Sequence, residues 1–369
     1  MVKQILKIIG LIVGIVVVAV GILLGWLTAG EYKPADIEEL SVSQAASDPG
    51  AGELSPGDSF KIMSWNIGYG ALGDNADFFM DGGDSVMTAD EERVSSNLDG
   101  IISHIKSEDP DIVFLQEADR DSKRSHHVDE VSTIASAFEN QYGSTFANNF
   151  KVPFVPYPLP PIGKVDSGLL TLSEYEISQS ARISLPCPFS WPIRTANLKR
   201  CLMADRTPVS GGKELVVINL HLEAYDNGEG KIAQTNALLD VLNEERSKGN
   251  YVIAGGDFNQ TFDNIDSGAY PVLEGMWQPG SISADDFGEG WSLLMDASVP
   301  TCRSLDRPLA GLNDSARDPS VFQYYMIDGF IVSDNLEVSG LKTQDLGFEN
   351  TDHNPVVMKV KIGTSENSN

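Results

Sequence analysis

Polar side chains that could bind a hard cation or a phosphate group stand where several short apolar runs of this chain end. They lie in the stretches SWNIG, LQE, INLHL, GGDFN, MIDGF and TDHNP, and they are Asn66, Glu117, Asn219, His221, Asp257, Asn259, Asp328, Asp352 and His353. Carboxylate and amide oxygens without thiolates suit Mg²⁺, with Mn²⁺ or Ca²⁺ as alternatives, rather than zinc or copper. Each residue alone also fits a local hydrogen bond or a turn, so the prediction depends on their combination.

The stretch VIAGGDFNQ, residues 252–260, has two interpretations. It is either a turn that leaves the core or a strand that delivers Asp257 and Asn259 to a reaction centre. Alternation along a strand places these two side chains on one side and Phe258 on the packing side. We expect the two glycines before them to allow close backbone approach where a side chain would crowd a phosphate.

The apolar patterns predict the elements that position these residues. Strands are expected over 60–65, 111–117, 168–175, 181–186, 200–209, 214–224, 251–259, 322–333 and 354–362, and helices over 89–108, 128–141 and 231–246. Short turns between the strands of 168–224 predict antiparallel meanders. Strands grouped between outer helices predict sheets that pack on each other and are covered by helices.

Two stretches lack a regular pattern. Residues 150–164 are dense in proline among aromatic and aliphatic residues, which predicts an extended loop rather than a helix or a central strand. That loop either packs on its own domain or forms an apolar lip at a substrate cleft or against a bilayer. Residues 260–320 are acidic and irregular.

The polar stretches occur in the order found in the endonuclease/exonuclease/phosphatase superfamily, the fold of deoxyribonuclease I, and over roughly residues 60–360 the chain resembles that superfamily. SWNI, QE, NLHL, GGDFN, the ID before a strand and TDH carry the resemblance. A weaker match is SGLLTLSEY and the residue after it, because Glu174 stands where a basic residue is common and Glu176 where a proline is common. The resemblance implies a four-layer α/β/β/α sandwich of two mixed sheets flanked by helices, and a divalent-metal phosphoesterase.

The resemblance also implies roles for single residues. Glu117 would be the principal metal ligand, with Asn66 beside it and Asp352 as a further ligand. Asp257 would orient or deprotonate the attacking water. The other expected roles are a phosphate hydrogen bond from Asn259, donation to a phosphate oxygen by His221, and a base or electrostatic stabiliser at His353 held by Asp328.

The N-terminal region differs from the rest of the chain. Residues 8–27 are 20 residues without a charge, about 30 Å as a helix and enough to cross a hydrocarbon core. Lys3 and Lys7 before them favour an inner N-terminus (1–7), with everything after the anchor outside the cytoplasm. A cleaved signal peptide is the alternative, but the run is long and the site after it is poor.

Four segments therefore follow the short N-terminus. They are a transmembrane anchor at 8–27, an acidic linker at 28–59, a catalytic domain at 60–362 and a polar tail at 363–369.

Charge and cysteines constrain the partners. The part of the chain after the anchor holds 24 cationic and 53 acidic side chains, a net charge of −29, which repels polyanions unless a basic patch intervenes. The candidate patches are short, at 123–127 and at 194–200. Among the three cysteines, Cys187 and Cys201 could pair, and the composition indicates no structural zinc site.

Three classes of function remain open. A phosphodiesterase that acts on phospholipid headgroups fits the anchor, the apolar loop and the acidic surface. An extracytoplasmic nuclease fits the superfamily but conflicts with the charge. A catalytically inert binding module is disfavoured, because every expected polar position is filled. The sequence therefore predicts a membrane partner and a phosphate-ester substrate, with nucleic acid as the alternative substrate.

Overall fold

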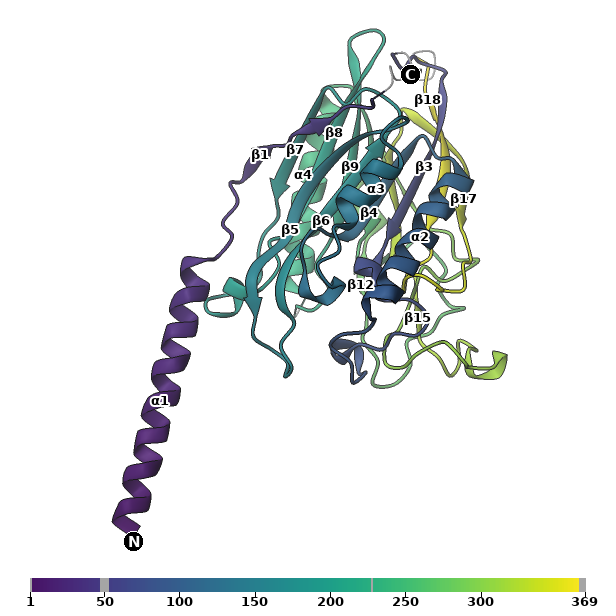
Figure 1. Cartoon of the computed structure of the whole chain (residues 1–369). Helices are drawn as coiled ribbons and strands as arrows, with labels where there is room; N and C mark the ends of the chain where they lie inside the picture. Colours follow the sequence, from purple (N-terminus) through teal and green to yellow (C-terminus); the bar gives the residue numbers. More distant parts are fainter. Residues whose placement is uncertain (1, 47–52, 227, 365–369) are drawn as a thin grey trace.

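Two seven-stranded mixed sheets pack face to face in the computed structural model, which describes residues 2–46, 53–226 and 228–364 (Figure 1). Sheet I has the order β1-β7-β8-β9-β10-β16-β13, with β1 at Ile37–Glu39, β7 at Gln179–Ser184, β8 at Cys201–Val209, β9 at Lys213–His221, β10 at Tyr251–Asp257, β16 at Asp328–Ser333 and β13 at Trp291–Leu294. Sheet II has the order β17-β18-β3-β4-β6-β5-β2, with β17 at Leu336–Thr343, β18 at Val356–Ile362, β3 at Ser59–Asn66, β4 at Ile112–Asp119, β6 at Gly163–Ser173, β5 at Gly143–Val155 and β2 at Val42–Ser43. In each sheet one pair is parallel, β9 with β10 and β3 with β4.

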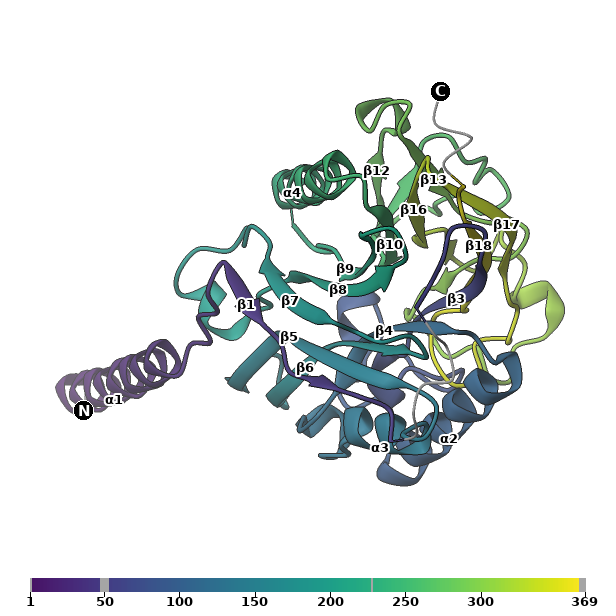
Figure 2. The same ribbon diagram turned by 90° about the horizontal axis from the view of Figure 1, so that it is seen from above.

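Helices cover the outer face of each sheet (Figure 2). Helices α2 (Glu91–Glu108) and α3 (Glu130–Ala137) lie on sheet II, and α4 (Glu229–Ser247) lies on sheet I. In α2, the apolar stripe through Leu98, Ile101 and Ile105 is buried against sheet II, and the Asp90 side chain accepts a hydrogen bond from the Arg93 amide at the N-terminus. The predicted four-layer sandwich is confirmed.

The remaining elements are short. Two small sheets pair β11 (Gln260–Phe262) with β12 (Gly280–Ile282) and β14 (Cys302–Arg303) with β15 (Tyr324–Tyr325). Single 3₁₀ turns are η1 at Gly68–Gly70, η2 at Phe79–Asp81, η3 at Lys123–Ser125, η4 at Ile193–Ala196, η5 at Ala284–Asp286 and η6 at Asp314–Ala316. Several of these turns border the end of the sandwich where β3, β4 and β10 finish.

The two glycines of β10 serve the packing of the sheets. A Cβ at Gly255 would lie 2.4 Å from the Phe330 ring, and one at Gly256 would lie 1.9 Å from the Leu220 carbonyl oxygen. The expectation that these glycines make room for a phosphate is therefore wrong. They let β10 sit closely between its neighbours, while Phe258 is fully buried in the layer below α4, as alternation predicted.

Three predicted elements need correction. Much of the expected loop 150–164 is strand, because β5 runs to Val155 and pairs with β6. The proline at 153 is tolerated there because the ladder shifts register between Val152 and Val155. The expected meander is interrupted, since β6 lies in sheet II and β7 in sheet I, and the expected strand 322–333 is divided into β15 and β16.

Part of the expected linker belongs to the folded domain. Ile37–Glu39 pairs with β7 of sheet I, and Val42–Ser43 pairs with β5 of sheet II, so this segment crosses the edges of both sheets. Residues 47–52 of the linker and 365–369 of the tail lie outside the described residues. Cys187 is exposed and Cys201 is buried, and both thiols are free, so the two do not pair.

A helix at the N-terminus, α1 (Val2–Ala29), is long and apolar enough to cross a membrane. A membrane anchor and a signal sequence both meet that criterion. In Figure 1 this helix projects from the domain, and the C-terminal end of the helix lies against the domain.

Asp205 gives the sandwich a testable pH dependence. It is 1% exposed between the sheets, where its carboxylate accepts from Thr145 Oγ1, and burial raises its pKa to about 6. The unfolded chain releases this proton nearer pH 4, so the free energy of unfolding falls as pH rises from about 4 to about 6. Asp205→Asn removes this ionisation. We therefore expect the free energy of unfolding of the variant, minus that of wild type, to rise by about 3 kcal/mol between pH 4 and pH 7.

Urea unfolding of both proteins in detergent at several pH values measures this difference. The exposed Asp99→Asn on α2 is the matched control. A difference between Asp205→Asn and wild type that stays constant with pH would refute the prediction.

Candidate active site

The predicted polar residues meet at one end of the sandwich, with one exception. Six of them line a single cavity of ≈ 870 Å³, and these are Glu117, His221, Asp257, Asn259, Asp352 and His353. Asn66 and Asp328 lie directly behind that wall, where Asn66 is hydrogen-bonded to Glu117 and Asp257 and Asp328 to His353. The exception is Asn219, which lies between the sheets, accepts from Gln116 Nε2 at 2.8 Å and donates to two main-chain carbonyls.

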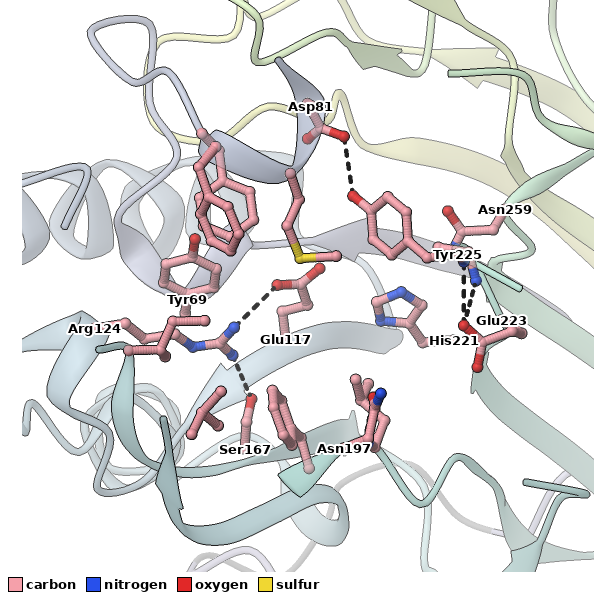
Figure 3. A pocket seen from close by; sticks show the side chains of 18 of the residues that line it. Tyr69, Asp81, Glu117, Arg124, Ser167, Asn197, His221, Glu223, Tyr225 and Asn259 are labelled. Carbon is pink, nitrogen blue, oxygen red and sulfur yellow. Dashed lines mark hydrogen bonds and ion pairs between the residues drawn. The ribbon is translucent and has the colours of Figure 1, made fainter. Parts of the chain in front are cut away.

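A bulge in β4 turns Glu117 toward the cavity. The pairing of β4 with β6 shifts register between Leu115 and Ala118, and Glu117 has φ = 57°. A left-handed glutamate is unfavourable, and such residues gather where a side chain has to be redirected. As a result the carboxylate lies between Arg124 and His221 rather than in the sheet (Figure 3).

Asn66 ties the Glu117 side of the site to the Asp257 side. Its Nδ2 donates to Glu117 Oε1 and to Asp257 Oδ2, both at 3.1 Å, and its Oδ1 accepts from the Gly68 amide at 3.0 Å. The amide nitrogen, rather than the oxygen, therefore faces the carboxylates. In this arrangement Asn66 holds two acids in place, and its predicted role as a metal ligand stays a prediction.

His353 is held between two aspartates. Its Nδ1 lies 2.8 Å from Asp328 Oδ2, and its Nε2 lies 3.8 Å from Asp257 Oδ2. Burial alone would lower the pKa of His353, but the Asp328 carboxylate outweighs it and raises the pKa well above its ordinary value. The ring is therefore an imidazolium at neutral pH, which favours the stabiliser among the two roles expected for it.

Asp257 lies between His353 and a second histidine, His221. Burial and the negative charge of Asp328 raise the pKa of Asp257 to about 7, so its carboxyl group can exchange a proton near neutral pH. Burial, reinforced by Arg200, holds the pKa of His221 well below its usual range, so this ring is neutral. His221 Nε2 lies 3.4 Å from Asp257 Oδ2. Asn259 closes the group, since its main-chain amide donates to Asp257 Oδ1 at 2.8 Å and its side chain to the Leu222 carbonyl.

Asp352 approaches from the segment before β18. Its side chain is buried next to the backbone of Gly68, where φ is +52° and a Cβ would lie 2.9 Å from Asp352 Oδ1. Burial raises the pKa of Asp352 to about 6, with the Glu117 charge adding to the effect and His353 opposing it. The close contact leaves no room for a side chain at position 68, and the left-handed backbone there also favours glycine.

The donor set fits a divalent cation. Asp257, Asp328 and His353 offer ligand atoms within 4.8 Å of one another, as do Cys302, Asp352 and His353. Burial raises the pKa of the Cys302 thiol to about 12, so this group stays protonated and is a poor ligand. His353 is protonated in this state and offers no lone pair to a metal, so the donors that remain are hard carboxylate oxygens. Burial raises the pKa of Asp257 and of Asp352, and a bound Mg²⁺ would stabilise their charged forms.

Four further residues of the cavity were not predicted from the sequence (Figure 3). The Arg124 guanidinium stacks 3.7 Å above the Tyr69 ring, binds Asp119, and lies 3.9 Å from Glu117 Oε2. Tyr225 donates its hydroxyl hydrogen to Asp81 Oδ1 at 3.0 Å, and burial raises the pKa of Asp81 to about 6. Of these four residues, only Arg124 was indicated by the sequence, as part of the short basic patch at 123–127. The other three stand in irregular segments, where no periodic pattern predicts which way a side chain points.

Comparisons with known proteins decide the family. A sequence model of the endonuclease/exonuclease/phosphatase family matches residues 63–353. The chain belongs to this family. Members of the family are hydrolases that act on phosphodiester bonds, generally with divalent metals. A search among curated proteins finds no match to the chain.

Solved structures agree in fold. An endonuclease/exonuclease/phosphatase protein from Beutenbergia cavernae is 19% identical with a TM-score of 0.55, covering 83% of this chain and 72% of its own. A family protein from Bacteroides vulgatus is 15% identical with a TM-score of 0.50, covering 83% and 99%. D. rerio TDP2, solved with a single-strand DNA product, is 14% identical with a TM-score of 0.50, covering 82% and 99%. At these identities the likeness concerns the fold alone.

Proposed function

We propose that this family member is a membrane-anchored, divalent-metal-dependent phosphodiesterase that hydrolyses a phospholipid headgroup ester, with its catalytic domain outside the cytoplasm. The observation that carries the catalytic part is the buried group of Asp257, His353 and Asp328 beside Glu117, opening on one cavity. Glu117 and Asp352 would hold the metal. When bound, it supplies positive charge to the phosphate oxygens.

The chain's own residues account for the movement of protons. A water oxygen forms the new bond to phosphorus, and Asp257, with a pKa of about 7, takes its proton. The bond between phosphorus and the departing oxygen breaks, and the His353 imidazolium stabilises the charge that develops or gives that oxygen its proton. Asp328 keeps His353 charged and oriented. Asn259 and neutral His221 supply polar contacts beside the phosphate.

The cavity favours a lipid over a nucleic acid. Its arginines are already engaged: Arg124 binds Asp119, Arg200 lies 3.4 Å from Glu223 Oε2, and Arg303 donates to main-chain carbonyls such as that of Gly73. Nucleic-acid affinity depends mainly on cations that are free to meet phosphates. The net charge of −29 after the anchor acts in the same direction. Apolar residues such as Phe79, Phe150 and Ile162 make up much of the remaining lining.

Assays on the purified full chain in detergent test this proposal. The substrates are a bis-aryl phosphate, phosphatidylcholine, sphingomyelin and plasmid DNA, each with Mg²⁺, Mn²⁺ or Ca²⁺ and with EDTA. We expect metal-dependent hydrolysis of the bis-aryl phosphate and of a lipid. Activity that survives EDTA would contradict the metal requirement, and plasmid cleavage without lipid cleavage would favour the nuclease.

A further inference from the structure

One wall of the catalytic cavity comes from the helix proposed to anchor the protein. Leu24 and Leu27, in the last two turns of α1, line the same cavity as Glu117 and His353. Leu27 is only 2% exposed, whereas the apolar residues nearer the N-terminus of α1 are largely exposed. The C-terminal end of the helix is therefore part of the site's enclosure, in addition to any role as a tether.

Specific contacts fix this end of α1 to the domain. Glu31, just after the helix, has a side chain 3% exposed and lies 3.2 Å from Arg194 and 3.4 Å from Lys199. Trp191 Nε1 donates to Thr28 Oγ1 at 3.1 Å. A buried carboxylate is costly to leave without its cations, so these contacts stabilise the end of α1 against the cavity wall.

Helix α1 is long enough both to cross a membrane and to line the cavity. Its 28 residues extend about 42 Å, and the 22 residues before Leu24 still extend about 33 Å, which matches a hydrocarbon core of about 30 Å. Lys3 and Lys7 lie near the opposite end, where long cationic side chains can reach the headgroup layer. The last turns of α1 can therefore lie at the outer membrane surface and line the cavity.

The segments around the exit of α1 carry exposed apolar side chains. The connection between β5 and β6 presents Tyr157 at 70% and Leu159 at 86% exposure, and the segment at η4 presents Trp191 at 52% and Ile193 at 61%. Trp26 of α1 is 51% exposed, and its ring centroid lies 6.3 Å from that of Phe154. Exposed tryptophan and tyrosine beside apolar residues are typical of a membrane–water interface. Figure 1 shows the β5–β6 connection at the end of the domain toward which α1 projects.

We propose that the cavity opens onto the bilayer that holds α1, and that the enzyme draws its substrate laterally from that bilayer. This inference rests on the proposed function and specifies it. The substrate is a lipid of the same membrane, whose apolar chain lies along Leu24, Leu27 and Ile193 while its phosphodiester reaches Glu117 and His353. The rim formed by Tyr157, Leu159, Trp191 and Ile193 enters the interface.

Full-chain protein in phosphatidylcholine vesicles provides the test. Headgroup-labelled phosphatidylcholine or sphingomyelin is placed either in the protein's own vesicles or in separate protein-free vesicles. We expect release of labelled headgroup at least tenfold faster from the protein's own vesicles. Leu159→Asp should slow that release at least fivefold and leave bis-aryl phosphate hydrolysis in detergent within twofold. The matched control is Ile37→Asp, because Ile37 is 68% exposed but belongs to β1 at the edge of sheet I rather than to the rim, and it should change neither rate.

Quenching of tryptophan fluorescence by brominated acyl chains measures the membrane contact without catalysis. We expect quenching that decreases in Trp191→Phe. Equal release from both vesicle populations, no release of either labelled headgroup by an enzyme that cleaves the bis-aryl phosphate, or quenching unchanged in Trp191→Phe would overturn the inference. Failure to cleave the bis-aryl phosphate with any of the three metals would instead refute the proposed function.

Discussion

His353→Ala should lower phosphodiester hydrolysis by about three orders of magnitude while leaving the fold intact. The imidazolium is the cationic side chain closest to Asp257, 3.8 Å away, and it is only 5% exposed, so water cannot replace its charge efficiently. Initial rates on the bis-aryl phosphate at saturating Mg²⁺ measure the loss, and circular dichroism checks the fold. Activity like that of wild type would remove His353 from the mechanism.

Asp328→Asn tests whether catalysis needs the positive charge of His353 or only the presence of its imidazole ring. The Asp328 carboxylate holds the pKa of His353 well above its usual range, so in wild type the ring stays charged as pH rises past neutrality. Without that carboxylate the ring loses its proton at a lower pH. We therefore expect the alkaline limb of the pH–rate profile to move to lower pH, with kcat reduced. An unchanged alkaline limb would show that the His353–Asp328 pair does not control it.

The second large effect is expected at Glu117. Glu117→Gln keeps the shape of the side chain but removes a charge that the proposed metal site needs, so hydrolysis should fall by about three orders of magnitude. In wild type, added Mn²⁺ should raise Tm, because a ligand that binds only the folded chain stabilises it. We expect that rise to be largely lost in Glu117→Gln.

Glu108→Gln provides the control for Glu117, because Glu108 pairs with Lys61 outside the cavity lining. It should keep both the activity and the metal-dependent rise in Tm. A Glu117→Gln protein that still gains Tm with Mn²⁺ would place the metal elsewhere.

The sequence was sufficient for the type and the location of most site residues. Parallel neighbours end at the same edge of a sheet, as β3 with β4 and β9 with β10 do, and a polar residue at the end of such a run located Glu117 and Asp257. His353 stands before β18 rather than after a run, and the resemblance to the superfamily indicated its role. It failed for Asn219, which stands two positions before His221 in β9 and therefore points to the same face of the sheet. Asn219 lies deeper between the sheets, whereas His221 at the end of the strand reaches the cavity. Alternation predicts the face of a residue but not its depth along the strand.

Other features depended on tertiary contacts. The predicted reason for Gly255 and Gly256 was wrong because the Phe330 ring and the Leu220 carbonyl that crowd them come from neighbouring strands. Asp81 and Tyr225 are 144 positions apart, and only the fold brings them together. Strand β5 was missed because the prolines of 150–164 suggested a loop, although only Pro153 lies within the strand, where the ladder shifts register.

The buried amide contact between Gln116 and Asn219 has a consequence for how the site is assembled. Sheet II supplies Glu117 and sheet I supplies His221 and Asp257, so the site exists only when the two sheets stand in one alignment. Apolar faces alone would allow neighbouring alignments at small cost, whereas sliding would leave a buried amide unpaired, at about 1–3 kcal/mol. Gln116 directly precedes Glu117, and Asn219 lies two residues before His221. The hydrogen bond between the two amides therefore fixes the alignment of the sheets next to the groups whose relative position determines catalysis.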